Sequence, residues 1–379
     1  MMAMLALLVS AASNPTAQTR PIENTYSSVK AEVTAFVART HVPSLSYTIV
    51  DGRRQMMDSI GIADLNTARS ATPHTVFHLA SLAKPFVAAA VLSLQEQGKL
   101  RLDDRVTSVL PYFRLADPRY RDITVRHLLL HTSGLGDVTD YGFDRPLEDA
   151  GALERYVRSL STERLQATPG EKVAYSNIGY DILGDVIAKA SGMSFEGYMA
   201  AKIFAPLGMR HSTFLLRDVP KAELAQPYLV DSGTARPTKY FPYNRIHAPS
   251  GTLYSSAADM ARWLHFWLAS GSRVGPITSG SAAAMLQDEA TRNVKADEDI
   301  QPGQGIGWSS ITIDGIRLNG HGGHDQGFRS VMIFARDRHI GVVLMTNGDA
   351  DDVDVDGLSL VILGKLLGKD WSRFAKTGS

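Results

Sequence analysis

Segments that resemble β-strands occur near both ends of this 379-residue chain, whereas its middle carries helical patterns and long loops. The strand-like segments are residues 46–50, 55–62, 306–313, 317–321, 328–334 and 340–346. Strands so far apart in sequence bury a common apolar face only if they join one sheet. We therefore predict an α/β (α+β) fold, in which an antiparallel sheet from the N- and C-terminal segments is flanked by helices and a mostly helical lobe is inserted.

The helical segments are indicated by the spacing of apolar residues, which recur every three or four positions between Val29 and Val37. Further helices are predicted over residues 81–98, 180–190, 257–269 and 358–367. We place the sheet domain at residues 20–80 and 300–379, and the mostly helical domain at residues 81–299. Active sites commonly lie in the crevice between two such lobes.

The first twelve residues are almost wholly apolar and end in Ser10-Ala11-Ala12, which suits signal cleavage. This run is too short for a bilayer span, which needs about 20 apolar residues. We therefore interpret residues 1–19 as a signal peptide, or alternatively as a disordered start, since no Lys or Arg precedes the apolar run. The expected location is secreted or periplasmic, with the cytoplasm as the alternative and no stable membrane span.

Composition excludes several classes of protein. The chain has 39 Lys and Arg residues against 39 Asp and Glu residues, a balance that argues against a nucleic-acid partner. It has no cysteine, which excludes a thiol nucleophile, a thiolate zinc site and an iron–sulfur cluster. We therefore expect oxygen and nitrogen chemistry on a small-molecule substrate.

The segment Ser81-Leu82-Ala83-Lys84 opens the helix predicted over residues 81–98. A lysine three residues after a serine lies on the same helix face, so its amine can activate the hydroxyl as a nucleophile. A second Ser-x-x-Lys occurs at Ser27 and Lys30, where a solvated helix is the better explanation.

Tyr175-Ser176-Asn177 precedes the helix predicted over residues 180–190. A tyrosine beside a lysine loses its proton more readily and can act as a general base, and an asparagine can bind a substrate amide or ester. The alternative is that Ser176 or Asn177 merely caps the helix.

The third candidate is the glycine-rich run from Gly320 to Gly327, which contains His321, Gly322, Gly323 and His324. Glycines at a strand edge let a ligand approach the backbone, and an N–H there can complete an oxyanion hole with the N–H of Ser81. The alternative is a hairpin turn with two exposed histidines.

Metal and cofactor signals are weak. His127 and His131 lie four apart but lack the glutamate of a zinc helix, so we interpret them as core residues. Residues 352–357 resemble half of a calcium loop, but its twelfth position is Leu363, so we interpret them as an acidic start to the last helix. Gly303 to Gly307 lacks the strand–turn–helix context of a dinucleotide site. We expect no metal and no cofactor.

Together the three segments resemble the serine β-lactamase and penicillin-binding-protein superfamily, with its Ser-x-x-Lys, Tyr-x-Asn and Lys/His-x-Gly elements in that order. The chain is most similar to the class C branch, which includes D-Ala-D-Ala carboxypeptidases, D-aminopeptidases and family VIII carboxylesterases. Residues 131–135, 249–255 and 305–308 also resemble family segments, although Thr252 replaces a glycine. The resemblance covers residues 43–367.

This resemblance implies that Ser81 is the nucleophile, Lys84 and Tyr175 shuttle protons, and Asn177 binds substrate. His321, Gly322 and Gly323 are then expected to line the cleft, with the N–H groups of Ser81 and His324 as the oxyanion hole. His131 and Ser133 are expected to be structural.

β-Lactamases usually have lysine where this chain has His321. Because an unperturbed histidine titrates near about 6.5, the chain lacks a permanent cation for a β-lactam carboxylate. We expect a serine hydrolase that acts through an acyl-enzyme on a small ester, amide or D-amino-acid peptide, and that is at most a weak β-lactamase. The alternative is a non-catalytic penicillin-binding sensor or scaffold. The oligomeric state is left open.

Overall fold

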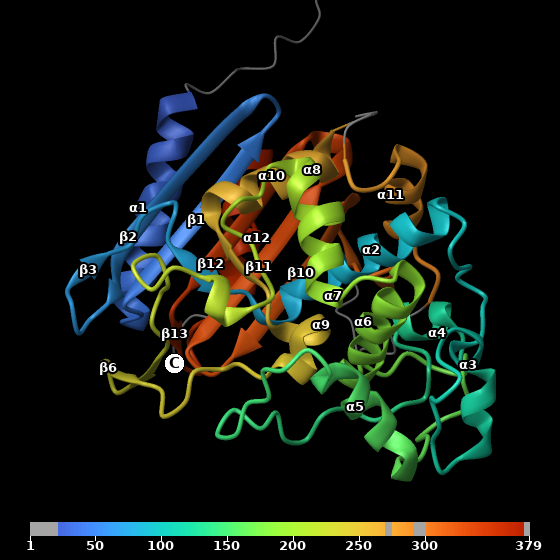
Figure 1. The fold of residues 1–379 in the computed structure, drawn as a ribbon. Helices are drawn as coiled ribbons and strands as arrows, with labels where there is room; N and C mark the ends of the chain where they lie inside the picture. The colour runs from blue at the N-terminus through green and yellow to red at the C-terminus, as the bar shows by residue number, and fades with distance from the viewer. Residues whose placement is uncertain (1–21, 270–274, 291–300, 375–379) are drawn as a thin grey trace, which may run out of the picture.

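The computed structural model describes residues 22–269, 275–290 and 301–374. Eight strands form one antiparallel sheet in the order β3-β2-β1-β12-β11-β10-β9-β8. N-terminal β1 (Ser44–Asp51) pairs directly with C-terminal β12 (Ile340–Thr346), so the two ends of the chain lie side by side (Figure 1). The predicted antiparallel sheet from both ends of the chain, with its flanking helices, is confirmed.

The other strands of this sheet are β2 (Arg54–Asp64), β3 (Arg69–Ser70), β8 (Gln301–Gln304), β9 (Ser309–Ile313), β10 (Ile316–Asp325) and β11 (Phe328–Ala335). Two small sheets are made by β4 (Val76–His78) with β7 (Tyr254–Ser256), and by β5 (Tyr228–Asp231), β6 (Thr234–Pro237) and β13 (Gly348–Asp349). Each strand pair is antiparallel except β13 with β5.

The longer helices are α1 (Ile22–Thr40), α2 (Lys84–Glu96), α5 (Ala152–Ser159), α6 (Asn177–Ser191), α10 (Ala257–Leu268), α11 (Ser279–Met285) and α12 (Val355–Leu367). Short helices are α3 (Val106–Val109), α4 (Val125–Leu129), α7 (Phe195–Tyr198), α8 (Ala205–Leu207) and α9 (Ala248–Gly251). A π-helical turn (Met199–Phe204) joins α7 to α8.

Helices cover both faces of the large sheet. Helices α1 and α12 share a core with one face, and the predicted apolar positions Val29, Val33 and Phe36 are buried there. On the other face α10 packs against β1 and β12, although it comes from the middle of the sequence. Helices α3 to α7 gather beyond the β10 side of the sheet, at the right of Figure 1.

Most predicted elements occur with shifted boundaries. The helix predicted from residue 81 is a 3-10 turn (Ala80–Ala83) that continues into α2. The strand predicted over residues 306–313 begins only at Ser309, because Gly307 has a φ of 73° that a strand does not allow. Residues 1–19 lie outside the described residues, and the division of the chain at residues 81 and 299 stays a prediction.

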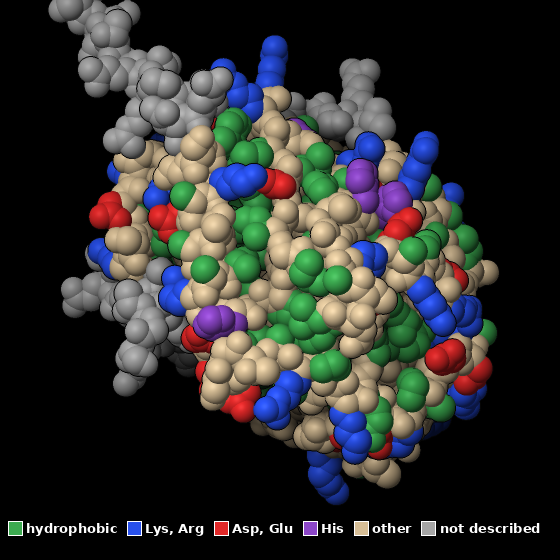
Figure 2. Space-filling view, turned by 90° about the vertical axis from the view of Figure 1, so that its left-hand side faces the viewer, with side chains coloured by type: hydrophobic (Ala, Val, Ile, Leu, Met, Phe, Trp, Pro, Cys, Tyr) green, Lys and Arg blue, Asp and Glu red, His purple; other side chains and the backbone are tan. Residues whose placement is uncertain are grey.

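Within the described ranges, no helix is both long and apolar enough to cross a bilayer. Figure 2 shows the face that carries the β2 and β3 edge, where acidic and basic side chains are interspersed. This mixture agrees with a formal net charge of zero.

The buried side chain of Asn347 ties the two ends of the chain together. Its Oδ1 accepts hydrogen bonds from the backbone N–H and the hydroxyl of Ser44, at 2.8 and 2.7 Å. Its Nδ2 donates to the carbonyl oxygens of Ala63 and Gln226, at 3.1 and 3.0 Å. One amide therefore satisfies backbone groups from β1, β2 and the segment before β5.

We expect Asn347→Ala to lower the free energy of unfolding by about 3 kcal/mol, because it leaves several buried backbone groups without a hydrogen-bond partner. Asn319→Ala is the matched control, since Asn319 is also buried in the sheet but donates one long bond of 3.5 Å. Urea titration of both variants measures the difference. Equal losses of unfolding free energy in the two variants would show that the Asn347 hydrogen bonds stabilise the fold no more than the single bond of Asn319.

Candidate active site

Ser81 is presented by a strained turn between a strand and a helix. β4 ends at His78, and Ala80 then adopts a left-handed φ of 47°, which is uncommon for a residue with a side chain. The N–H of Leu82 donates to the Leu79 carbonyl, which closes the 3-10 turn that carries Ser81 into α2. Strain of this kind persists where the surrounding structure enforces it, commonly at functional sites.

The Lys84 side chain is completely buried and has three hydrogen-bond partners. Its Nζ lies 2.9 Å from Ser81 Oγ, 2.6 Å from Asn177 Oδ1 and 2.6 Å from the carbonyl oxygen of Ser250. Together these partners occupy the three donor directions of an ammonium group.

Burial lowers the pKa of Lys84 from 10.5 to about 7, because an ammonium is poorly solvated in the protein interior. The negative charges of Asp181, Asp137 and Asp325 act in the opposite direction. Lys84 is therefore poised to exchange a proton near neutral pH.

Tyr175 is a partly exposed residue that contacts Ser81. Its hydroxyl donates to Ser81 Oγ at 2.8 Å, and 37% of the residue is exposed. Its ring stacks on His131 with centroids 4.5 Å apart, and His131 Nδ1 accepts the N–H of Ser176 at 3.2 Å. The Ser176 side chain caps α6 by accepting the N–H of Gly179. The capping interpretation is therefore confirmed for Ser176, and the chemical interpretation of this segment stays a prediction.

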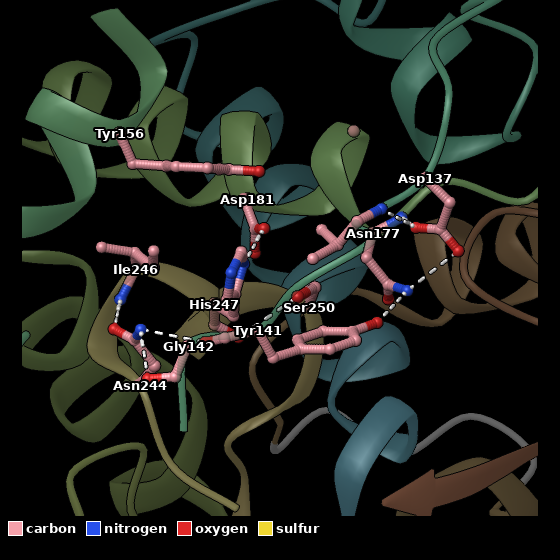
Figure 3. Close-up of polar contacts among 12 residues, drawn as sticks. Asp137, Tyr141, Gly142, Tyr156, Asn177, Asp181, Asn244, Ile246, His247 and Ser250 are labelled. Carbon is pink, nitrogen blue, oxygen red and sulfur yellow. Dashed lines mark hydrogen bonds and ion pairs between the residues drawn. The ribbon is translucent and has the colours of Figure 1, made fainter. Parts of the chain in front are cut away.

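Asn177 begins α6 and is engaged on both sides of its amide (Figure 3). Its Oδ1 accepts from Lys84, and its Nδ2 donates to the hydroxyl of Tyr141 at 2.8 Å and to Asp137 Oδ2 at 3.3 Å. The Asp137 carboxylate also accepts the Asn177 backbone N–H at 2.7 Å. Asn177 thus connects the buried lysine to the loop of residues 137–141.

Residues 320–325 of the glycine-rich run form the second half of β10, and Gln326 and Gly327 make the hairpin turn to β11. Residues 316–320 pair with β9, whereas residues 321–325 pair with β11 on their other edge. Gly323 is required at its position, because a Cβ there would overlap the carbonyl of Leu79 in the turn before Ser81. Ser330 on β11 donates to the same carbonyl at 2.7 Å. The strand edge is thereby held against the turn that carries Ser81.

Side chains alternate between the two faces of β10. His321 and Gly323 lie on the face toward Ser81, whereas a Cβ on Gly322 would point at Asp356 of α12. The His324 side chain pairs with Asp349 at 3.1 Å, on the same face as Gly322. For Gly322 and His324, only the backbone is therefore available to the cleft.

A cavity of about 300 Å³ lies beside these residues. Tyr175, His131 and His321 line one side of it, and Ser309 and Leu360 lie on other sides. Its size is at the lower end of small-molecule sites. The cavity borders Tyr175, whereas Ser81, Lys84 and Asn177 are not among the residues that line it.

The alternative signals have structural explanations. Ser27 is exposed on α1, and its neighbour Lys30 pairs with Asp58 at 2.8 Å. Asp354 caps α12 through the N–H of Gly357, which agrees with the acidic helix start predicted there. Over the ranges the structure describes, no three His, Asp or Glu side chains are placed to hold a metal ion.

Sequence reasoning missed the Ser250 carbonyl, Asp137 and Tyr141. Pro249-Ser250-Gly251 was noticed only as a family-like segment, and a backbone carbonyl carries no residue-type signal. Asp137 and Tyr141 lie in a loop with no periodicity. Only the three-dimensional structure shows that these groups surround Lys84 and Asn177.

Comparison with known proteins identifies the family to which this chain belongs. Residues 29–365 match the family model described as Beta-lactamase. Penicillin-binding protein 4 of Amycolatopsis lactamdurans is 30% identical, with 86% of this chain and 87% of that protein covered. Protein flp of Staphylococcus aureus strain MW2 is 26% identical over 83% of this chain, which spans 61% of that protein.

Among solved structures, the octameric penicillin-binding protein homologue from Pyrococcus abyssi superposes with a TM-score of 0.79 and 26% identity. The match covers 92% of this chain and 79% of that one. With the family model matched over most of its length, the chain belongs to the beta-lactamase family.

Proposed function

We propose that this protein is a serine hydrolase that acts through an acyl-enzyme on a small ester, amide or D-amino-acid peptide. The observation that carries the proposal is the contact of Ser81 Oγ with both Lys84 Nζ, at 2.9 Å, and the Tyr175 hydroxyl, at 2.8 Å. A hydroxyl between two proton-transfer groups is the arrangement of an activated nucleophile.

In acylation, neutral Lys84 accepts the proton of Ser81. Two N–H bonds of the neutral amine donate to Asn177 Oδ1 and the Ser250 carbonyl, both at 2.6 Å, which leaves the nitrogen lone pair directed at Oγ. Oγ then attacks the substrate carbonyl carbon, and the departing alcohol or amine takes a proton delivered through Tyr175.

The tetrahedral oxyanion would be held by the backbone N–H groups of Ser81 and His324. This assignment is supported by the close approach of β10 to the Ser81 turn, which Gly323 permits. In deacylation, water attacks the Ser81 ester while the same lysine and tyrosine transfer its proton, and the acid is released.

The substrate end opposite the acyl group would lie near His321. A histidine attracts a carboxylate more weakly than the lysine that is usual in β-lactamases, and its attraction depends on pH. We therefore favour ester, amide or peptide substrates, with at most weak turnover of β-lactams. The name of the 30% identical relative, a penicillin-binding protein, supports testing whether penicillin acylates Ser81.

We expect Ser81→Ala to reduce hydrolysis of p-nitrophenyl esters by about 10³-fold or more, because the nucleophile is lost. Ser27→Ala is the matched control, since Ser27 belongs to the other Ser-x-x-Lys and is exposed on α1. Undiminished turnover in Ser81→Ala would contradict the proposal. A fluorophosphonate adduct on Ser81 that forms once, without ester or peptide turnover, would indicate the sensor instead.

The pH dependence follows from Lys84, whose neutral form is the base. Because its pKa is lowered to about 7, the neutral fraction grows as pH rises through that value. We expect kcat/KM to rise about tenfold per pH unit below pH 6 and to level off above about pH 8. Ester hydrolysis measured from pH 5 to 9 tests this, and a rate that falls across that range would exclude Lys84 as the base.

His321→Lys is expected to speed acylation of Ser81 by benzylpenicillin at pH 8 by about tenfold, since a hydrogen bond to a charged group is worth about 1.5 kcal/mol. His74→Lys adds the same charge at an exposed histidine beside His211 and serves as the control. Stopped-flow labelling with a fluorescent penicillin gives the rates. The same rate for both variants would remove His321 from the carboxylate end of the cleft.

A further inference from the structure

A buried acid–histidine pair lies behind the lysine of the candidate site (Figure 3). His247 Nδ1 is 2.7 Å from Asp181 Oδ2, and both side chains are almost completely inaccessible to solvent. Neither Asp181 Oδ1 nor His247 Nε2 has a hydrogen-bond partner among the described residues. A pair with two unsatisfied buried atoms is costly, so its presence calls for a physical reason.

The surroundings of His247 determine its proton arrangement. The rings of Tyr141 and Tyr156 stand edge-on to the imidazole, each with centroids 5.1 Å away. A charged imidazolium would bury an Nε2–H that has no acceptor there. We therefore assign the proton to Nδ1, from which it is donated to the Asp181 carboxylate. Burial raises the pKa of Asp181, and His247, Ser250 and Lys84 oppose that rise.

The pair is connected to Lys84 through two helices. Asp181 lies four residues after Asn177 on α6, so both side chains lie on the same helix face. Ser250 on α9 accepts from Lys84 through its carbonyl, and its hydroxyl donates to the carbonyl of His247 at 3.2 Å. The two helices pack closely at Gly184, where a Cβ would overlap Pro249. The Asp181–His247 bond therefore fixes the turn that presents the Ser250 carbonyl.

We propose that Asp181 and His247 are positioning residues for Lys84: they hold the Ser250 carbonyl in place and put a negative charge behind the amine. This inference rests on the proposed function, in which the two acceptors of Lys84 direct its lone pair at Ser81. Neither residue contacts Ser81, so their effect passes through Lys84.

Other charged groups also face this cluster. The negative charges of Asp137, in the loop before α5, and of Asp325, at the end of β10, raise the pKa of Lys84. The centroids of the Tyr175 and Tyr180 rings lie 4.8 and 5.5 Å from Lys84 Nζ. Asp140, in the loop before α5, also lies within electrostatic range of His247. Asp181 is the carboxylate with the greatest effect on Lys84, so its removal gives the clearest test.

The test is Asp181→Asn, which keeps the shape and an acceptor for His247 but removes the charge. We expect the acid limb of kcat/KM to move to lower pH by about one unit, because Lys84 loses a neighbouring negative charge and deprotonates more easily. Asp185→Asn is the matched control, one turn further along α6, where Asp185 is buried and accepts from Tyr112 at 2.9 Å. Its limb should stay at the wild-type position.

A merely structural role would lower the rate without moving the limb. A folded Asp181→Asn with an unmoved limb, or an equal shift in Asp185→Asn, overturns the inference. His247→Leu gives a second measurement if Asp181→Asn does not fold. It removes the donor to Asp181, which raises the pKa of that carboxyl and should also move the limb to lower pH.

A direct titration separates this inference from the proposed function. In NMR spectra of protein carrying ¹³C-labelled lysine, the Lys84 signal is identified by its loss in Lys84→Arg, and its midpoint should fall by about one pH unit in Asp181→Asn. If wild-type protein shows no Ser81-dependent reaction, the proposed function fails while this titration still tests the pair. If wild-type protein reacts but neither the limb nor the lysine midpoint moves in the variant, only the pair's role is refuted.

Discussion

The burial of the Lys84 amine is the constraint on which the site depends. Removing an ammonium from water is costly, and the protein compensates with two acceptors at 2.6 Å, from Asn177 on α6 and Ser250 on α9. These contacts bring α2, α6 and α9 to one point, although they are far apart in sequence. The same burial that requires these acceptors also lowers the pKa of Lys84 to about 7, as the base of the proposed function requires.

The large sheet supplies the other half of the site. Its contribution depends on the absence of side chains, because Gly323 allows β10 to touch the Leu79 carbonyl just before Ser81. Ser330 on the neighbouring strand holds that carbonyl by a hydrogen bond. Asn347 in turn anchors the N-terminal strands to the C-terminal ones. The sheet that positions the edge of β10 beside Ser81 is therefore assembled from both ends of the chain.

Local patterns predicted the elements, and the order of motifs predicted the site residues that touch Ser81. Gly52, with a φ of 61°, lies in the turn between the two predicted N-terminal strands, and Ser176 caps α6. Contacts across long sequence separations were beyond this reasoning. Asp181 carries no local sequence signal, and nothing local pairs it with His247, which lies in another turn. The shifted start of β9 likewise reflects packing of Gly307 against α2, which no strand periodicity encodes.

The geometry also bears on whether an acyl-enzyme would persist. Acylation needs only Lys84 and Tyr175 beside Ser81, and a sensor would share those contacts. Hydrolysis further needs water at the acyl carbon. Tyr175 is 37% exposed and Ser81 is partly accessible, so solvent reaches the neighbourhood of Oγ. Ser250 and the Asp181–His247 pair cover the side of Lys84 that faces away from Ser81. In the proposed mechanism, Lys84 then returns to its neutral form and acts as a base for that water. Under the proposed function, a solvent-accessible serine beside a buried base would support hydrolysis of the acyl-enzyme rather than a permanent adduct.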